Sequence, residues 1–459
     1  MRRAASPALA AVTTVAVLAV LLLAPFAVAA QPLFSPEGPS HVPVEDDAEA
    51  DLFEQILSGI TEASAAIVEG RNASADVVVA AAAAKARPPP KAAPSQVAKM
   101  VGRVLAAASL QSEALSALGD PSYFWYPDGR HALYRLPRGR PARGLCVFAG
   151  GCKHDAEAWF YKSKKCTFCL GLPEEVAHTK QCLARGYAVL ALSSKDREWT
   201  SRCFSSSGDP ALSDHPDTKW ALQTFTAQHG LRRKPIYMFG VSSGASFAVK
   251  FPGTMAIQGV FSEVNQPWEY RWGVTNGKGK LLVPFPPTAY VWMQRDAQTK
   301  RQIEKAVDIL RRNGVRSDSI FSPPRQVSKA YLSSRSMLIT PVQSALIQKA
   351  LRRLHVLDAN GFVRYDPRMR TLWAAQLLCA LPWLATNKAY LNLVQDQSQI
   401  WEELNVAWSL HEGVADYVRP TLMWLESRGK ANLNALVKRY SLDGRLSCLT
   451  ERVEGCPKR

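Results

Sequence analysis

The sequence lacks the motifs that mark several large classes of protein. Neither a G-x-G-x-x-G segment nor a P-loop occurs among its 459 residues, so nothing predicts a nucleotide site. It has one C-x-x-C, Cys166 to Cys169, whereas a zinc site would need a second pair and a redox role a thioredoxin-like setting. The apolar run at 372–385 is too short to cross a membrane and contains Pro382. We therefore expect no cofactor, no metal ion and no second membrane segment.

Acidic residues are scarce relative to basic ones. The chain has 39 Asp and Glu against 56 Lys and Arg, which gives a formal net charge of +17. Such an excess can favour anionic partners, including acidic glycans, phospholipid headgroups or nucleic acid. Because the basic residues are spread along the whole chain without a long basic tract, we favour a solvated surface and predict no nucleic-acid partner.

The N-terminus has the layout of a secretory signal. Arg2 and Arg3 precede an almost purely apolar run at residues 8–24, and small residues at 27–30 provide a cleavage pattern. The apolar run is also long enough to span a bilayer if it is not removed. Residues 1–30 are therefore a signal peptide or a signal anchor, with the rest of the chain secreted or on the lumenal side of the membrane.

The cysteine count agrees with that compartment. Nine cysteines, an odd number, favour some disulfides and at least one free thiol. The sequence leaves their connectivity open, although Cys448 and Cys456 are placed to join the C-terminal end. Asn72, in Asn-Ala-Ser, is a candidate glycosylation site.

Composition divides the remaining chain into three parts. Residues 31–118 contain two expected helices, at 52–68 and 96–118, separated by an alanine- and proline-rich stretch that we interpret as a linker. Residues 119–430 form the expected catalytic domain, and residues 431–459 a C-terminal tail. We see no chemistry in the first part and interpret it as a spacer or stalk.

Short apolar segments alternate with helical ones from residue 122 onward. The expected strands are 123–126, 132–136, 145–149, 187–192, 236–239, 257–264 and 289–293, and the expected intervening helices are 174–185, 217–228 and 299–312. This alternation predicts an α/β fold with a mainly parallel sheet flanked by helices.

The segment Gly240-Val241-Ser242-Ser243-Gly244 links an expected strand to an expected helix. A serine on such a tight strand-to-helix turn projects its hydroxyl from the end of a sheet, and flanking glycines let strand and helix pack closely around it. Strand, G-x-S-x-G and helix in this order predict a nucleophile elbow with Ser242 as the nucleophile.

The order of these features resembles the α/β-hydrolase superfamily of serine esterases and lipases, over residues 122–430. The resemblance implies that backbone N–H groups hold the oxyanion, one from Ser243 and one from Gly151 or Cys152. The loop Gly150-Gly151-Cys152-Lys153-His154 follows a strand as required, although it is not a full H-G-G-G match. His154 either lines the site or has a surface or packing role.

The resemblance also implies an acid and a base in the order Ser, Asp, His. Asp296 follows the strand at 289–293, where the superfamily places its acid, and Glu263 is the alternative. His411 precedes the expected final helix at 414–427 and is the preferred base, while His355 is the competing histidine. The acid would orient the imidazole, which takes the proton of the serine.

Two further features leave alternatives open. Asp296 and His411 are 411 − 296 = 115 positions apart, so we expect a helical insertion at about 315–400, with helices at 345–357 and 372–385. Its Trp373 and Trp383 either form an apolar cap or pack within the insertion. The aromatic residues Trp159, Phe160 and Tyr161 either line an acyl pocket or pack.

The sequence thus predicts a serine hydrolase that cleaves a small-molecule or lipid-like carboxylic ester through an acyl-enzyme, without a metal or organic cofactor. The alternatives are a non-catalytic, membrane-tethered binding or scaffold protein of the same fold, and an acyltransferase that uses the same triad.

Overall fold

We describe the protein from a computed structural model that places residues 118–198, 201–276, 278–386 and 392–441. The predictions for the signal segment, the accessory helices, Asn72, Cys448 and Cys456 lie outside these residues. In the part of the chain that is described, every helix is too short or too polar to cross a membrane.

The chain divides into two compact units. The sheet and the site described below lie in the unit that comprises residues 114–374 and 393–459, and residues 375–392 belong to the other unit.

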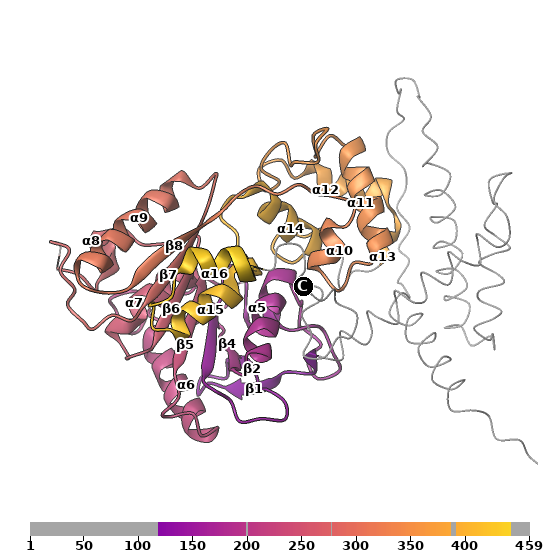
Figure 1. Ribbon diagram of the computed structural model, residues 1–459. Helices are drawn as coiled ribbons and strands as arrows, with labels where there is room; N and C mark the ends of the chain where they lie inside the picture. The colour runs from indigo at the N-terminus through magenta and orange to yellow at the C-terminus, as the bar shows by residue number, and fades with distance from the viewer. Residues whose placement is uncertain (1–117, 199–200, 277, 387–391, 442–459) are drawn as a thin grey trace, which may run out of the picture. The chain divides into compact units, whose positions relative to one another are not determined.

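An eight-stranded sheet forms the centre of the unit that comprises residues 114–374 and 393–459 (Figure 1). Its strands are β1 (Ser122–Trp125), β2 (His131–Arg135), β3 (Leu145–Ala149), β4 (Ala188–Ala191), β5 (Ile236–Val241), β6 (Gly259–Glu263), β7 (Thr288–Met293) and β8 (Ser317–Ser322), in the spatial order β1-β2-β4-β3-β5-β6-β7-β8. Only β2 pairs in antiparallel fashion, with β1 and β4, and all other pairs are parallel. The predicted α/β fold with a mainly parallel sheet is confirmed.

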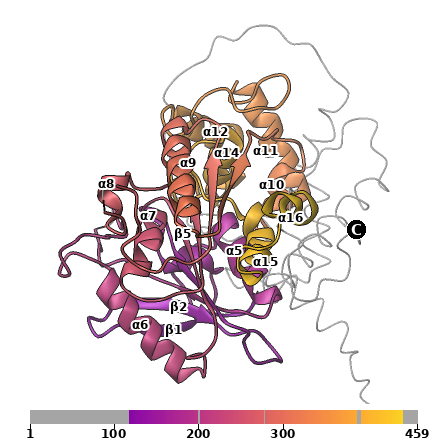
Figure 2. The ribbon, with the colours of Figure 1, turned by 60° about the vertical axis from the view of Figure 1, so that its left-hand side comes forward.

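Helices cover both faces of the sheet (Figure 2). One face carries α5 (Pro173–Ala184), α15 (Val418–Glu426) and α16 (Leu433–Tyr440), and the other carries α6 (His215–Gln228), α7 (Ser243–Lys250) and α9 (Ala297–Arg312). Every residue of β3, β4, β5 and β6 is buried, since parallel strands between two helical layers meet no solvent. This explains why β3, β4 and β5 are nearly continuous apolar runs, whereas β6 ends in the buried polar residues Ser262 and Glu263.

The parallel pairing brings the functional segments to one edge of the sheet. Ala149 at the end of β3 pairs with Gly240, and Val241 at the end of β5 pairs with Glu263 of β6. Because parallel strands end on the same side, the segments that follow β3, β5 and β7 start close together there.

The predicted insertion begins later than expected. Residues 317–322 form the edge strand β8, which pairs with β7 and has only Ile320 and Phe321 as apolar residues. Beyond it, α10 (Tyr331–Arg335) contacts both α11 (Pro341–Arg353) and α14 (Gln399–Trp408). The strand was missed because an edge strand so rich in serine has no clear apolar alternation.

Other helix boundaries also differ from the prediction. α11 begins four residues before 345 because Thr340 and Gln343 form a capping box. The single helix expected at 372–385 is two helices, α12 (Leu372–Ala380) and α13 (Trp383–Thr386), since Pro382 cannot continue a helix.

The C-terminal predictions need correction too. The final helix expected at 414–427 is a short 3-10 turn, Ala415–Tyr417, followed by α15. The segment 431–459, predicted as a tail, contains the helix α16. α14 was not predicted at all.

Two glycines permit the close approach of strand and helix at the turn after β5. A Cβ atom added to Gly244 would lie 2.0 Å from the carbonyl oxygen of Ala149, and one added to Gly240 would lie 2.2 Å from that of Gly244. Both contacts are with backbone atoms, which cannot rotate away. The spacing of the two glycines therefore reflects the packing of β3, β5 and α7.

We expect Gly244→Ala to destabilise the protein by more than about 2 kcal/mol, because overpacking against rigid backbone forces a shift of the turn. The matched control is Gly208→Ala, where an added Cβ meets no atom within 4 Å. That change should stay within about 0.5 kcal/mol of the wild type. Urea unfolding measures both, and equal stability of the two variants would contradict the close packing at Gly244.

Candidate active site

Ser242 occupies the turn between β5 and α7 in a strained conformation. Its φ of 51° and ψ of −110° lie outside the regions that non-glycine residues favour. Neighbouring groups hold this backbone, because the Ser242 N–H donates to the carbonyl of Glu263 (3.0 Å) and Asn265 Nδ2 donates to the Ser242 carbonyl (2.9 Å). The hydroxyl is left partly exposed at the end of the sheet.

His411 reaches this hydroxyl from the loop that follows α14. The distance between Ser242 Oγ and His411 Nε2 is 2.9 Å, so the serine can donate its proton to the ring. The imidazole is 38% exposed, which leaves room for a substrate beside it. His411 itself has a positive φ of 52°, so its loop also needs support from its surroundings.

Asp296 completes the chain of hydrogen bonds. Its Oδ2 lies 2.7 Å from His411 Nδ1, and its Oδ1 accepts from the Thr299 N–H (3.1 Å) as the N-cap of α9. Burial alone would raise the pKa of Asp296, but the hydrogen bonds from His411 and Thr299 outweigh it and lower that pKa. The carboxylate therefore stays ionised beside the imidazole. The structure thus brings together the three residues predicted as Ser, His and Asp.

The alternative acid and base lie elsewhere. Glu263 is fully buried, and its carboxylate is bonded to His178 Nε2 (2.6 Å) and the Val414 N–H (2.8 Å) rather than to His411. His355 is exposed just beyond α11.

The predicted oxyanion loop faces the nucleophile. A Cβ added to Gly151 would lie 3.5 Å from Ser242 Cβ, so this backbone borders the hydroxyl. Ser243 is the first residue of α7, and the first N–H groups of a helix have no partner within it. The Cys152–Cys203 disulfide, which the sequence left open, joins the loop to the segment whose Phe204 N–H donates to Ser243 Oγ (3.3 Å).

Several other sequence candidates have a packing role. Trp159 and Phe160 are fully buried, and Trp159 stacks on Phe148 with ring centroids 4.4 Å apart. Trp373 is buried and packs against Trp401. The alternative of core packing therefore holds for these aromatics.

The C-x-x-C cysteines form a buried disulfide, Cys166–Cys169. The free cysteines of the described residues are Cys146, Cys182 and Cys379.

Arg368 is a site residue that sequence reasoning missed. Its guanidinium donates to the carbonyls of His411 (3.1 Å) and Leu410 (2.6 Å), and Asp366 lies 3.4 Å from its Nε. The segment after α11 thus holds the backbone of the base. No local pattern marks this arginine, since its partners lie more than 40 positions away.

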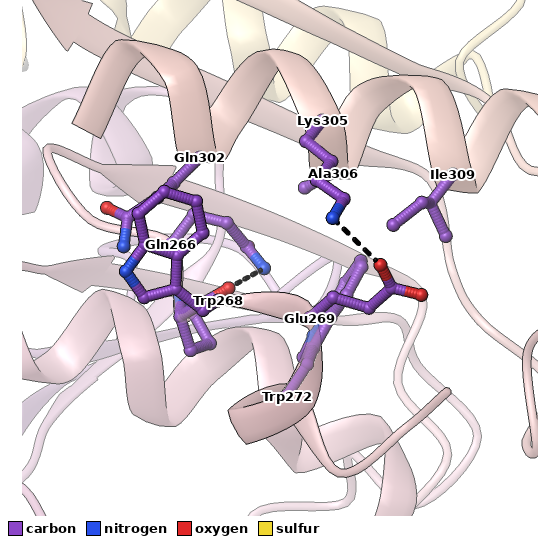
Figure 3. Close-up of a pocket in the computed structure, with 9 residues that line it drawn as sticks. Gln266, Trp268, Glu269, Trp272, Gln302, Lys305, Ala306 and Ile309 are labelled. Atoms are coloured by element: carbon purple, nitrogen blue, oxygen red, sulfur yellow. Dashed lines mark hydrogen bonds and ion pairs between the residues drawn. The ribbon is translucent and has the colours of Figure 1, made fainter. Parts of the chain in front are cut away.

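A small pocket lies between α9 and the short helix α8 (Glu269–Trp272), as Figure 3 shows. An ion pair between Lys305 and Glu269 (3.1 Å) closes one side of it. Its lining includes none of the residues Ser242, Asp296 and His411, so we do not assign the substrate to it.

Comparison with known proteins gives a likeness of fold. No family model matches the chain, and no curated protein matches it. An alpha-beta serine hydrolase homologue from Coxiella burnetii has 12% identity and a TM-score of 0.31, over 45% of this chain and 87% of that one. A Pyrobaculum calidifontis esterase has 12% identity and a TM-score of 0.31, over 48% and 82%. An esterase/lipase from an uncultured bacterium has 12% identity and a TM-score of 0.30, over 66% and 95%.

These structural similarities are too weak to assign the fold. The assignment therefore depends on the topology and the site geometry of this chain. A parallel sheet with an antiparallel β2, a strained serine between β5 and α7, and an acid and histidine that follow in the order Ser, Asp, His together define the α/β-hydrolase fold. The resemblance found in the sequence is confirmed at the level of the fold.

We expect Arg368→Gln to slow the reaction of Ser242 with a fluorophosphonate by about tenfold to a hundredfold, because a small shift of His411 weakens the activation of the serine. The unfolding midpoint should change little, since Arg368 holds a loop rather than the core. The matched control is Arg364→Gln, at an exposed arginine of the same segment. Equal labelling rates for both variants would contradict a positioning role.

Proposed function

We propose that the protein is a serine hydrolase that cleaves a carboxylic ester through an acyl-enzyme. The observation that carries this proposal is the unbroken chain of hydrogen bonds from Ser242 through His411 to Asp296, at 2.9 and 2.7 Å. Such a chain has a direct chemical use, because the imidazole can take the serine proton and the carboxylate stabilises the resulting imidazolium.

The reaction would proceed in two halves. Ser242 Oγ attacks the ester carbonyl carbon while His411 Nε2 takes its proton, and the backbone N–H groups of Ser243 and the Gly151 region stabilise the oxyanion. His411 then returns the proton to the leaving alcohol, which leaves an acyl group on the serine. A water molecule, deprotonated by His411, attacks this acyl group and releases the acid and the free serine.

Two exposed apolar side chains close in sequence to Arg368 favour an apolar or lipid-like ester as the substrate. Met369 and Leu372 are 81% and 68% exposed and closely follow Arg368, which binds the His411 loop. Exposed apolar side chains at this point favour contact with an acyl chain.

The acyltransferase alternative keeps the first half of the reaction and replaces water by another acceptor alcohol. The binding-protein alternative needs no activated serine, and the strained Ser242 and the hydrogen-bonded His411 count against it.

The location of the protein is part of the proposal. We infer a secretory-pathway protein, secreted or held at the membrane by its N-terminal segment. The disulfides Cys152–Cys203 and Cys166–Cys169 support an oxidising compartment.

A fluorophosphonate probe should label the wild-type protein, and Ser242→Ala should abolish the labelling because Ser242 is the serine whose hydroxyl is hydrogen-bonded to the base His411. Ser246→Ala, on the same helix α7, is the matched control and should be labelled like the wild type. Hydrolysis of short- and long-chain p-nitrophenyl esters should follow the same pattern. Persistent labelling of Ser242→Ala would exclude this serine as the reactive one.

We expect Asp296→Asn to lower ester hydrolysis by about four orders of magnitude, the scale found when the triad acid loses its charge. The Thr299 N–H keeps the side-chain oxygen as its acceptor, so the new NH₂ group would face His411 Nδ1. The imidazole would then carry its proton on Nε2 and could not accept from the serine.

The control for this change is Asp308→Asn, at an exposed acid of α9 whose ion pair with Arg312 lies on the helix surface. It should retain full activity. An Asp296→Asn variant within tenfold of wild-type activity would show that another group orients the base.

A further inference from the structure

A cluster of buried titratable side chains lies where the oxyanion loop, α5 and α14 meet. His154 ends the loop after β3, Glu175 belongs to α5 and Glu402 to α14. The three side chains are no more than 6% exposed, and their potential ligand atoms all lie within 4.8 Å of one another. The hydrogen bonds that link Ser242, His411 and Asp296 involve none of these three side chains, so the proposed hydrolysis does not use them.

Hydrogen bonds among the described residues account for only part of this cluster. His154 Nδ1 is bonded to Glu175 Oε1, and the carboxyl groups of Glu175 and Glu402 can hydrogen-bond to each other when one of them holds a proton. When both are ionised, Glu175 Oε2 and both oxygens of Glu402 have no donor. An unpartnered buried carboxylate is costly, because it has lost its hydration and gained nothing in return. A group that fills these positions must supply positive charge or protons.

Asn405 is a second unpartnered group on the same face of α14, one turn beyond Glu402. Its Nδ2 donates to Glu412 Oε2 (3.0 Å), so its carbonyl oxygen is the end that stays free. That oxygen is buried and has no partner in the described part of the chain. Glu412 therefore orients the amide and leaves its buried oxygen without a donor.

We propose that His154, Glu175 and Glu402 bind a divalent transition-metal cation, with Zn²⁺ as the first choice. One imidazole nitrogen and two carboxylates form a mixed donor set that suits Zn²⁺ and, less tightly, Mn²⁺. Ligands about 2.1 Å from a tetrahedral zinc ion are about 3.4 Å apart, so small movements of the side chains close the site.

The balance of charge points the same way. The carboxyl groups of Glu175, Glu402 and Glu412 are all buried near one imidazole. A cation held by His154, Glu175 and Glu402 would compensate this buried negative charge and give the carboxylate oxygens a partner.

The bound cation has a structural role next to the site. The His154 N–H donates to the Gly151 carbonyl (3.1 Å) and closes the turn of the oxyanion loop. A cation on His154 fixes that turn to α5 and α14. This inference does not rest on the proposed esterase activity, since metal binding is measured without a substrate.

The test begins with the full-length protein as purified. Metal analysis by mass spectrometry should find about one zinc or manganese ion per chain after extensive dialysis. Removal with dipicolinate should lower the unfolding midpoint, and addition of ZnCl₂ should restore it. Titration of the stripped protein with ZnCl₂, MnCl₂ and CaCl₂ in separate calorimetric runs should give the tightest binding for Zn²⁺.

Glu402→Gln and His154→Asn should each weaken Zn²⁺ binding by at least about a hundredfold, because each removes a direct ligand. The matched control is His131→Asn, which breaks another histidine–glutamate pair, with Glu157 at 2.8 Å, and should keep full affinity. Equal zinc stoichiometry and affinity in the ligand variants and the wild type would overturn the proposal.

A measurement on the wild type keeps the test decisive if the variants fail to fold. Co²⁺ added to the stripped protein should give the visible absorption of a four-coordinate nitrogen–oxygen site. Failure of the wild type to bind any of these cations would instead show that Glu175 and Glu402 share a proton, and would reject the metal site. Neither result depends on whether Ser242 is reactive.

Discussion

The hydrogen bond between His411 Nε2 and Ser242 Oγ joins residues 169 positions apart, and the proposed chemistry depends on it. The backbone of both residues is in an unfavourable conformation, because Ser242 and His411 both have positive φ. Such conformations persist only where neighbouring segments fix them. The surroundings of the two residues therefore matter as much as the residues themselves.

Several segments of the chain hold the loop of His411 in place. On one side, Asp296 binds the ring and Arg368 binds the backbone carbonyls. Upstream, Ser409 Oγ accepts from the Gln294 N–H and donates to the Ser322 carbonyl, which ties the loop to the ends of β7 and β8. Downstream, the Val414 N–H donates to the buried carboxylate of Glu263 (2.8 Å), and the Ala415 N–H donates to that of Glu174 (2.7 Å). The imidazole is thus positioned by elements of the sheet, by α5 and by the insertion.

A buried ionic network links the insertion to these anchors. Arg335 of α10 is fully buried and pairs with Glu174, Glu403 and Asp416. A buried charge is tolerated only when it is paired, and breaking such a pair is strongly destabilising. The network joins α10, α5, α14 and the turn after His411 in one rigid group. The long insertion therefore supports the base, a role that neither of the two sequence-based interpretations, an apolar cap or packing within the insertion, had included.

The elements that could be predicted are those whose signal is local. Strands β3, β4 and β5 are buried on both faces, so their sequences are nearly unbroken apolar runs. The turn that bears Ser242 requires glycines at fixed positions, and these can be recognised directly in the sequence. β8 and α14 were missed for the opposite reason. Half of the residues of the edge strand β8 are serines, and α14 buries glutamates, which are usually solvent-exposed.

The order of strand, serine turn, acid and histidine could be predicted from the amino-acid sequence, because each depends on residue types within a short stretch. The sequence favoured Asp296 but left Glu263 open, because Asp296 follows one strand and Glu263 ends the strand before it. The choice between them depends on the folded arrangement, in which Glu263 is bonded to His178 in the core and Asp296 to His411. Arg368, the disulfide at Cys152 and the cluster around Glu402 likewise depend on contacts between distant segments. Such contacts produce no periodic pattern of residue types in the sequence, because they form between groups that are brought together only when the chain folds.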